Sequence, residues 1–441
     1  MKGRTLIVAA LLGTLSVATS GAAIQNGTAA PPELPAQIAR ILSHPDLGGA
    51  RLGLRVQDVK GGEVLADYNS DELFAPASVD KIFTAAAALW RLSPSFVWQT
   101  PVAYRGRRAD NTVVGDLWVL GRGAPDIVEE KLWLAARDIH DMGLVRVTGN
   151  LIVDDRYFDA ERYGDGWPGG SQVLEAYHAP ISALMADYAA RREGSEWRAV
   201  DDAALHFGER FRAILELVGV RLEGRVRYPN DKERAAVPAT TEVTAEDASV
   251  AMPEQLMLLY TIRSEPLGRL VLDLNKFSNN IVAESILKTL GAIEYGPPGT
   301  AIKGLAVVAR FLDEELDIPI NSYIQADGSG LSGRDRFSPQ QVVDLLTYAY
   351  SDFHLGPEFV SSLKLSGLDG WNPRAFKNPP LVGEMRLKSG HIKGVNTLSG
   401  YAHTDSGRIV AFCIMINGHH AAQWQVDQRM AEISRVILST Y

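Results

Sequence analysis

Apolar and polar residues alternate near both ends of the chain, which predicts β-strands there. Residues 51–59 and 63–69 alternate on either side of a Lys60-Gly61-Gly62 turn, a pattern typical of a hairpin. The same alternation returns close to the C-terminus, at 382–390, 396–404 and 408–418. We therefore expect one sheet built from the two ends of the chain.

The segments between these strands follow the helical period instead. Apolar positions three and four residues apart predict helices at 78–92, 253–262, 267–291, 301–316 and 338–350, with a final helix at 422–438. Residues 100–250 have another texture, in which short strands and helices alternate with many turns. The pattern thus predicts a helix-and-sheet core that is interrupted by a mixed α+β region.

The first residues resemble a secretory signal. Lys2 and Arg4 precede an apolar run that begins at Leu6 and ends in small residues, with a cleavage position after Ala22 or Ala23. A transmembrane anchor is the alternative, but the run is short for a span. We expect residues 1–23 to be removed, a proline-containing linker from Pro31, and an exported chain with no later transmembrane anchor.

Composition narrows the class of protein only modestly. The 441 residues carry a net charge of −9, which argues against a general nucleic-acid binder. The single cysteine, Cys413, excludes an intrachain disulfide. The nine histidines lack metal-ligand spacing; His419 and His420 are expected in a solvated turn. The acidic stretch 154–166 lacks the ligand order of a calcium loop, so we expect a structural loop.

Candidate chemistry begins with Ser-x-x-Lys, a spacing that occurs three times: Ser78/Lys81, Ser285/Lys288 and Ser361/Lys364. Ser285 lies within a predicted helix, where its hydroxyl would bond a backbone carbonyl. Ser78 instead opens a helix, where unpaired N–H groups would stabilise an oxyanion. Lys81 lies on the same helix face, and its apolar neighbours would lower its pKa. The alternative is that Ser78 only caps the helix.

Two further motifs follow Ser78 and Lys81 in a fixed order. Ser278-Asn279-Asn280 is the only Ser-x-Asn of the chain, and Lys388-Ser389-Gly390 is the only Lys-Ser/Thr-Gly. Ser78/Lys81 is the only Ser-x-x-Lys that precedes both. This triple resembles the signature of the penicillin-recognising serine enzymes.

The sequence around the motifs resembles one family of these enzymes in particular. The matching segments are 76–89, 120–127, 149–159, 273–288, 327–332 and 388–401. They resemble the D-Ala-D-Ala carboxypeptidase/endopeptidase family, that is, class C low-molecular-mass penicillin-binding proteins. The similarity runs over nearly the whole chain after the signal and is weakest at 185–250.

The resemblance implies an α/β (α+β) fold with a penicillin-binding/β-lactamase-like transpeptidase core. A discontinuous catalytic domain is expected at 31–99 and 252–441, with accessory material inserted at 100–251, between the first and second motifs. The long separation of these motifs disfavours a β-lactamase. The chain departs from the family at Asn279, at Ser389 and in the "GRDRF" segment at 333–337.

The resemblance also implies roles for residues. Ser78 would be the nucleophile and Lys81 its base, while Ser278 and Asn280 would shuttle a proton and hold the substrate amide. Lys388 and Ser389 would bind the terminal carboxylate. Gly390 and His391 complete the substrate-binding strand, and the backbone N–H groups of Ser78 and His391 would form the oxyanion hole.

The expected partners are peptidoglycan stem peptides ending in D-Ala-D-Ala, with β-lactams as inhibitors, and the expected location is the periplasm. No cofactor, metal or nucleic acid is implied. The predicted activity is serine-type D-Ala-D-Ala carboxypeptidase, with D,D-endopeptidase action as an extension. A catalytically weak peptidoglycan-binding relative and a β-lactamase remain the alternatives.

Overall fold

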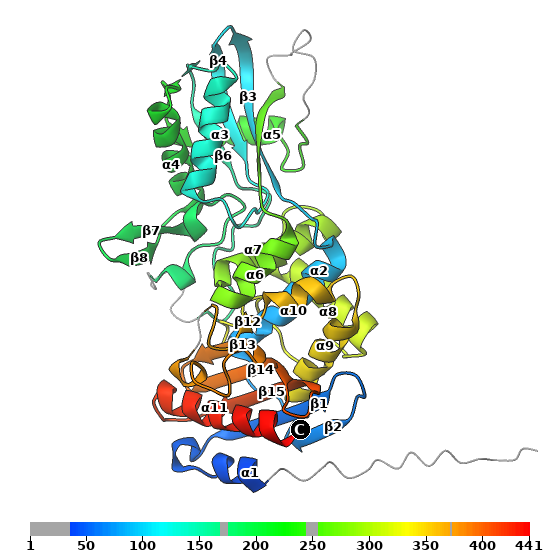
Figure 1. Ribbon diagram of the computed structural model, residues 1–441. Helices are drawn as coiled ribbons and strands as arrows, with labels where there is room; N and C mark the ends of the chain where they lie inside the picture. The colour runs from blue at the N-terminus through cyan, green and yellow to red at the C-terminus, as the bar shows by residue number, and fades with distance from the viewer. Residues whose placement is uncertain (1–35, 168–174, 244–254, 371–372) are drawn as a thin grey trace, which may run out of the picture. The chain divides into compact units, whose positions relative to one another are not determined.

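The computed structural model describes residues 36–167, 175–243, 255–370 and 373–441 (Figure 1). The predicted signal peptide, the proline-containing linker and the expected domain boundary at 251/252 lie outside these ranges. Among the described residues, no helix is long and apolar enough to cross a membrane.

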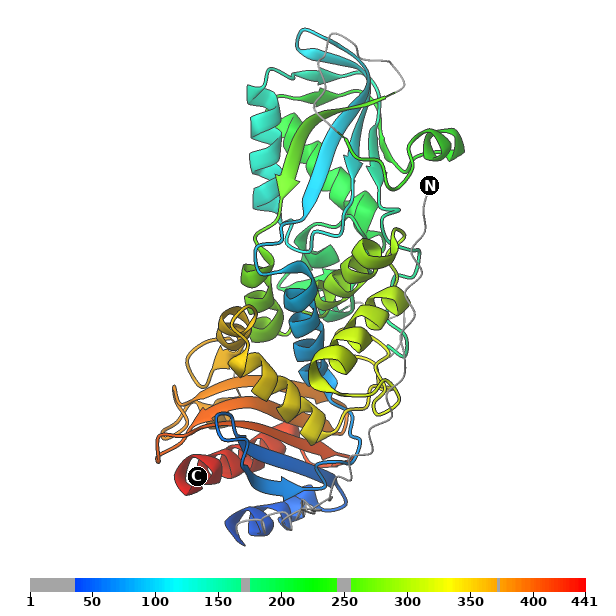
Figure 2. The same cartoon turned by 90° about the vertical axis from the view of Figure 1, so that its right-hand side faces the viewer.

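The two ends of the chain form one sheet of six strands, as the alternation predicted (Figure 2). The hairpin at 51–69 is confirmed, and its first strand pairs antiparallel with the last strand of the chain. The order across the sheet is β12 (Lys364–Leu365), β13 (Met385–Ile392), β14 (Val395–His403), β15 (Ile409–Asn417), β1 (Arg51–Asp58) and β2 (Val64–Tyr68).

Alternate residues of β15 face two different sets of helices. Ala411, Cys413 and Met415 belong to a core shared with α2 (Lys81–Leu92) and α9 (Pro339–Ser351). Phe412 and Ile414 belong to a second core with α11 (Gln423–Thr440) and α1 (Ala36–Leu42). This period of two, buried on both faces, makes the sheet the middle layer of three. The remaining core helices are α6 (Leu267–Phe277), α7 (Asn280–Tyr295), α8 (Ala301–Leu316) and α10 (Gly356–Ser362).

A second sheet, of seven strands, lies in the middle of the chain. Its strands are β3 (Gln99–Ala109), β4 (Thr112–Leu120), β5 (Arg146–Val147), β6 (Leu151–Asp154), β9 (Arg221–Leu222), β10 (Val226–Arg227) and β11 (Leu256–Arg263). The helices α3 (Glu129–Asp141) and α4 (Ala203–Leu217) cover one face, as Figure 1 shows. Outside the sheet lie α5 (Asp231–Ala236) and the hairpin of β7 (Ala190–Glu193) and β8 (Glu196–Ala199).

The predicted helix at 253–262 is wrong. Its described part forms β11, which pairs antiparallel with β3 from Leu256 to Arg263. Short apolar runs do not distinguish a helix from a buried strand by their period. This run has no separate polar face, as an amphipathic helix would, and it forms a strand of the sheet. We therefore propose that the inserted region ends near Arg263 instead of at 251.

The two ends of the proposed inserted region meet in space. The backbone N–H of Ser264 donates to the carbonyl of Trp98 at 3.1 Å. The N–H of Trp98 donates to the Ser264 hydroxyl at 2.9 Å. The chain thus leaves the core and returns to it at neighbouring positions.

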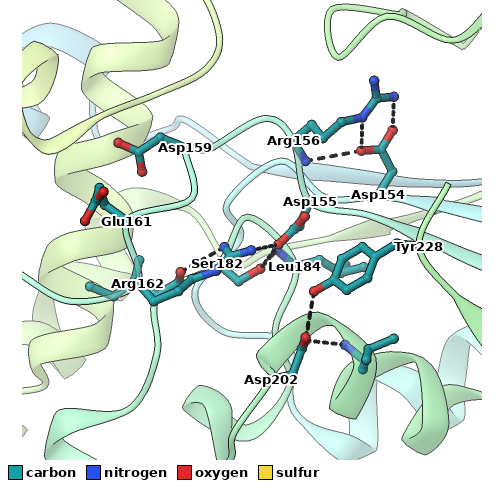
Figure 3. Close-up of polar contacts among 12 residues, drawn as sticks. Asp154, Asp155, Arg156, Asp159, Glu161, Arg162, Ser182, Leu184, Asp202 and Tyr228 are labelled. Atoms are coloured by element: carbon teal, nitrogen blue, oxygen red, sulfur yellow. Dashed lines mark hydrogen bonds and ion pairs between the residues drawn. The ribbon is translucent and has the colours of Figure 1, made fainter. Parts of the chain in front are cut away.

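The acidic stretch at 154–166 is tied down by ion pairs (Figure 3). Asp155 accepts hydrogen bonds from Arg162 at 2.5 Å and from the Ser182 hydroxyl at 3.0 Å. Arg156 binds Asp154 through two nitrogens. These carboxylates are occupied by protein cations, which agrees with a structural loop.

Candidate active site

Ser78 lies on a short 3₁₀ turn that leads directly into α2. The turn, η2 (Ala77–Asp80), begins at Ala77, whose backbone is in the left-handed conformation with φ +46°. Neither the turn nor α2 has a side-chain hydrogen bond at its N-cap. The alternative in which Ser78 only caps a helix is therefore wrong.

Lys81, the first residue of α2, reaches back to Ser78. Its side chain is fully buried. The Nζ atom lies 3.0 Å from the Ser78 Oγ, 2.6 Å from the Asn280 Oδ1 and 2.6 Å from the Ser329 carbonyl oxygen. The first and second predicted motifs are thus joined through one ammonium group.

Burial lowers the pKa of Lys81 to about 8, although four nearby carboxylates oppose the shift. The largest opposing effects come from Asp327 and Asp80. A lysine with a pKa near 8 is partly neutral at physiological pH, as a general base requires. The prediction that the surroundings of Lys81 lower its pKa is therefore confirmed.

One of the carboxylates near Lys81 is that of Asp335, which lies in the segment 333–337 where the chain departs from the family. Within the described chain, oxygens of Asp80, Asp327 and Asp335 form the one group of three that could hold a metal ion, all within 4.8 Å of one another. Burial, followed by the charge of Asp327, raises the pKa of Asp335 to about 11 and also raises that of Asp80. Asp335 therefore retains its proton at neutral pH.

The second motif lies where the predicted helix 267–291 breaks in two. Ser278 has φ +57° and ends α6, so the prediction of one continuous helix is wrong. The Asn279 Oδ1 accepts the N–H groups of Ile281 and Val282 and caps α7. Asn280 then turns inward, and its Nδ2 donates to the Tyr177 carbonyl at 2.9 Å. The break aims Ser278 and Asn280 at the site.

The third motif lies on β13. Lys388 is 1% exposed, and its Nζ donates to the Ser278 Oγ at 2.8 Å and to the Ser389 carbonyl at 2.9 Å. Burial, followed by the charges of Lys81 and Lys364, holds the pKa of Lys388 well below its ordinary value. The second and third motifs are therefore in direct contact.

Gly390 allows β13 to approach the turn that carries Ser78. A Cβ at position 390 would lie 2.7 Å from both the Ser78 nitrogen and the Pro76 carbonyl oxygen. The Thr397 hydroxyl donates to that same carbonyl at 2.7 Å. His391 follows with an exposed side chain, whose Nδ1 lies 3.2 Å from the Asn396 Oδ1.

The outer edge of β13 is open beside the motif. In the described part of the chain, β12 pairs with β13 only at Leu387 and Arg386. Positions 388–392 therefore have a strand partner on one side only, in β14. An extended peptide could add to this edge.

Sequence reasoning missed Lys364. This residue ends the third Ser-x-x-Lys, is 3% exposed, and donates from Nζ to the Ser389 Oγ at 2.5 Å. The spacing itself was the available signal, but Ser361 bonds its own helix through the Glu358 carbonyl and takes no part.

Two smaller expectations are also wrong. The buried Ser285 Oγ has no hydrogen-bond partner, so it does not bond a backbone carbonyl. His419 is 5% exposed and lies 2.9 Å from the Asn396 Oδ1 through Nε2 instead of facing solvent. His420 is exposed.

Comparison with known proteins bears directly on this arrangement. The model of the D-Ala-D-Ala carboxypeptidase 3 (S13) family matches residues 34–192 and 189–436. The chain belongs to this family. The predicted family, the class of enzyme (a serine-type D-Ala-D-Ala carboxypeptidase) and the penicillin-binding fold are thereby confirmed.

Two relatives are similar along most of their length. A D-alanyl-D-alanine carboxypeptidase from Actinomadura sp. (strain R39) is 29% identical over 478 residues, which cover 91% of this chain and 85% of the relative. The D-alanyl-D-alanine carboxypeptidase DacB of Haemophilus influenzae is 24% identical, with 87% and 89% covered. The crystal structure of penicillin binding protein 4 (dacB) from H. influenzae superposes with a TM-score of 0.76 at 20% identity, covering 91% and 99%.

Proposed function

We propose that Ser78 is the nucleophile of this S13-family enzyme and that Lys81 is its general base. The 3.0 Å contact between the Lys81 Nζ and the Ser78 Oγ is the observation that carries the proposal. The neutral amine would accept the hydroxyl proton as Ser78 attacks the carbonyl of a D-Ala-D-Ala bond. The positions of both groups at a helix start favour the resulting oxyanion.

The other motif residues would complete the reaction. Ser278, held by Lys388, would pass a proton to the leaving amine, and Asn280 would hold the substrate amide. Lys388 and Ser389 would bind the terminal carboxylate. The N–H groups of Ser78 and His391 would stabilise the oxyanion, while the open edge beyond Gly390 would pair with the peptide.

The carbon–nitrogen bond of the tetrahedral intermediate then breaks, free D-alanine leaves, and the peptide remains as an ester on Ser78. Water hydrolyses that ester and returns the proton to the serine. A β-lactam would acylate Ser78 by the same attack, but its leaving amine stays attached to the acyl group, so the ester would persist. We therefore expect β-lactams to inhibit the enzyme.

A second activity, D,D-endopeptidase, follows if the leaving residue belongs to another stem peptide. A pocket of about 770 Å³ adjoins Ser278 and Asn280 and is also lined by Tyr177, Tyr188 and Trp197. Such a volume offers room for a larger leaving group beside the proton-transferring serine. The signal-like N-terminus supports a periplasmic enzyme that meets cross-linked peptidoglycan.

Intact-mass measurement after incubation with benzylpenicillin tests the nucleophile. We expect one added penicillin on the wild type and none on Ser78→Ala. A lasting lack of adduct on the folded wild type would support the catalytically weak relative, and an adduct on Ser78→Ala would place the nucleophile elsewhere. Rapid release of hydrolysed penicillin would instead indicate a β-lactamase.

Product analysis separates the two peptidase activities. We expect the wild type to release D-alanine from a pentapeptide muropeptide and to convert cross-linked dimers to monomers. Loss of D-alanine without dimer cleavage would restrict the function to carboxypeptidase.

A further inference from the structure

Lys364 is a buried cation at the active site that the predicted mechanism does not use. It lies on β12, opposite Leu387 of β13, and its side chain extends to the neighbouring Ser389. Two lysines contact Ser389. Lys388, its neighbour in the motif, donates to the Ser389 backbone carbonyl, whereas Lys364 donates to the Ser389 hydroxyl.

The direction of the hydrogen bond to Ser389 is fixed by chemistry. An ammonium group has three donors and no acceptor, so the Ser389 Oγ must accept from Lys364. The hydroxyl hydrogen of Ser389 is then directed to another acceptor. A hydroxyl that accepts from a cation is polarised and becomes a stronger donor.

We propose that Lys364 is a positioning residue for carboxylate recognition: it orients and polarises the Ser389 hydroxyl toward the free carboxylate of the leaving residue. The ligand class is a D-amino-acid residue with an ionised α-carboxylate. This assignment rests on the proposed function and adds to it a residue that determines specificity for the free acid.

The electrostatics of the two lysines agree with this division. Lys388 is flanked by the cations Lys81 and Lys364, which add to the effect of burial on its pKa. Lys364 faces the carboxylates of Asp427 and Asp369, which partly oppose burial, and its pKa is about 8. Lys364 is therefore the more readily protonated of the two, and it supplies the positive charge behind Ser389.

Paired substrates test the assignment. We would measure KM and kcat of the mature enzyme on an N-acylated tripeptide ending in D-Ala-D-Ala and on its C-terminal amide. Lys364→Met should raise KM for the acid about 10-fold, as expected for loss of a charge-assisted contact. It should change kcat for the acid, and KM for the amide, less than about twofold, and Lys364→Arg should restore most of the loss.

A double-mutant cycle identifies the route of the effect. If Lys364 acts through Ser389, Lys364→Met should add nothing to Ser389→Ala. Lys303→Met is the matched control, because the described hydrogen bonds of the Lys303 side chain go to the carbonyls of Gly296 and Pro298 and to no residue of the three motifs. Its acid-to-amide preference should equal that of the wild type.

Two results would overturn the assignment of Lys364: equal losses on acid and amide, or multiplying effects of the two substitutions. Lys364→Gln, which keeps a donor without charge, replaces Lys364→Met in the same comparison if the latter does not fold. A folded wild type that hydrolyses neither peptide would overturn the proposed function as well, so the two failures are distinguishable.

Discussion

At the scale of single residues, the first and third motifs can approach each other because Gly390 has no side chain. The Cβ of Gly390→Ala would lie 2.7 Å from the Ser78 nitrogen, which is backbone and cannot rotate away. We expect acylation by benzylpenicillin to fall at least about 100-fold in a folded protein, because misplacing the nucleophile by an ångström costs that much.

Gly333→Ala is the matched control for this substitution. An added Cβ at position 333 meets nothing within 4 Å, and no left-handed backbone is needed there. The rate should remain near the wild-type value. A normal rate for Gly390→Ala would show that β13 and the Ser78 turn can separate without cost.

The pH dependence of acylation should report the protonation of Lys81. Its pKa of about 8 means that the amine is mostly charged at pH 7 and mostly neutral at pH 9. Since only the neutral amine can accept the Ser78 proton, the second-order rate of acylation should rise about 10-fold or less over this interval. A flat profile between pH 6.5 and 9 would contradict the role of Lys81 as base.

At the scale of elements, the break between α6 and α7 depends on Asn279. Asn279→Ala removes the acceptor for two N–H groups of α7 and should lower the free energy of unfolding by about 1 kcal/mol. It should also slow acylation, because Ser278 and Asn280 flank the cap. Denaturant unfolding and penicillin acylation measure the two effects.

Asn279→Asp is the informative comparison, since aspartate also caps helices well and favours the positive helix end. It should keep both the stability and the rate. This outcome would explain why asparagine at the middle of the motif is tolerated where the resemblance leads one to expect aspartate. Equal losses in both variants would exclude capping as the reason.

How far the sequence could predict the elements depended on how distinctive their periodicity was. The strands of β1, β14 and β15 alternate or are flanked by clear turns, and they were predicted. The break at Ser278 was not, because the apolar period continues across it and the cap is a three-residue detail. The sequence predicts a helix in place of β11 because Leu256–Tyr260 is apolar at nearly every position and so shows no strand alternation.

The site could be predicted where motifs share an order in the chain, and not where contacts depend on packing. Ser78, Lys81, Asn280 and Lys388 were expected and are brought together. The position of Lys364 beside Ser389 follows from the pairing of β12 with β13, a short two-residue ladder that sequence periodicity does not encode.

At the scale of the whole molecule, the region that we propose to be inserted contacts the site through Trp167. The buried Trp167 Nε1 donates at 2.7 Å to the Oδ2 of Asp327, a member of the carboxylate cluster near Lys81. Trp167→Phe would leave a buried carboxylate oxygen with one partner fewer. We expect the free energy of unfolding to fall by about 1–2 kcal/mol and acylation to slow several-fold.

Trp424→Ala serves as the control for loss of a tryptophan, because this side chain is exposed on α11. It should leave the acylation rate unchanged. If Trp167→Phe were equally silent in both measurements, the inserted region would be a bystander to the chemistry.

The meeting of Trp98 with Ser264 has a consequence for chain entropy. Closing a long flexible loop is costly, and the cost grows with the logarithm of its length. Here the intervening chain folds into its own sheet, so its two ends are held together by that sheet as well as by the core. The proposed inserted region therefore connects α2 to α6 with its two ends as close together as the ends of a tight turn. Insertions or deletions far from this junction need not change the distances among the three motifs.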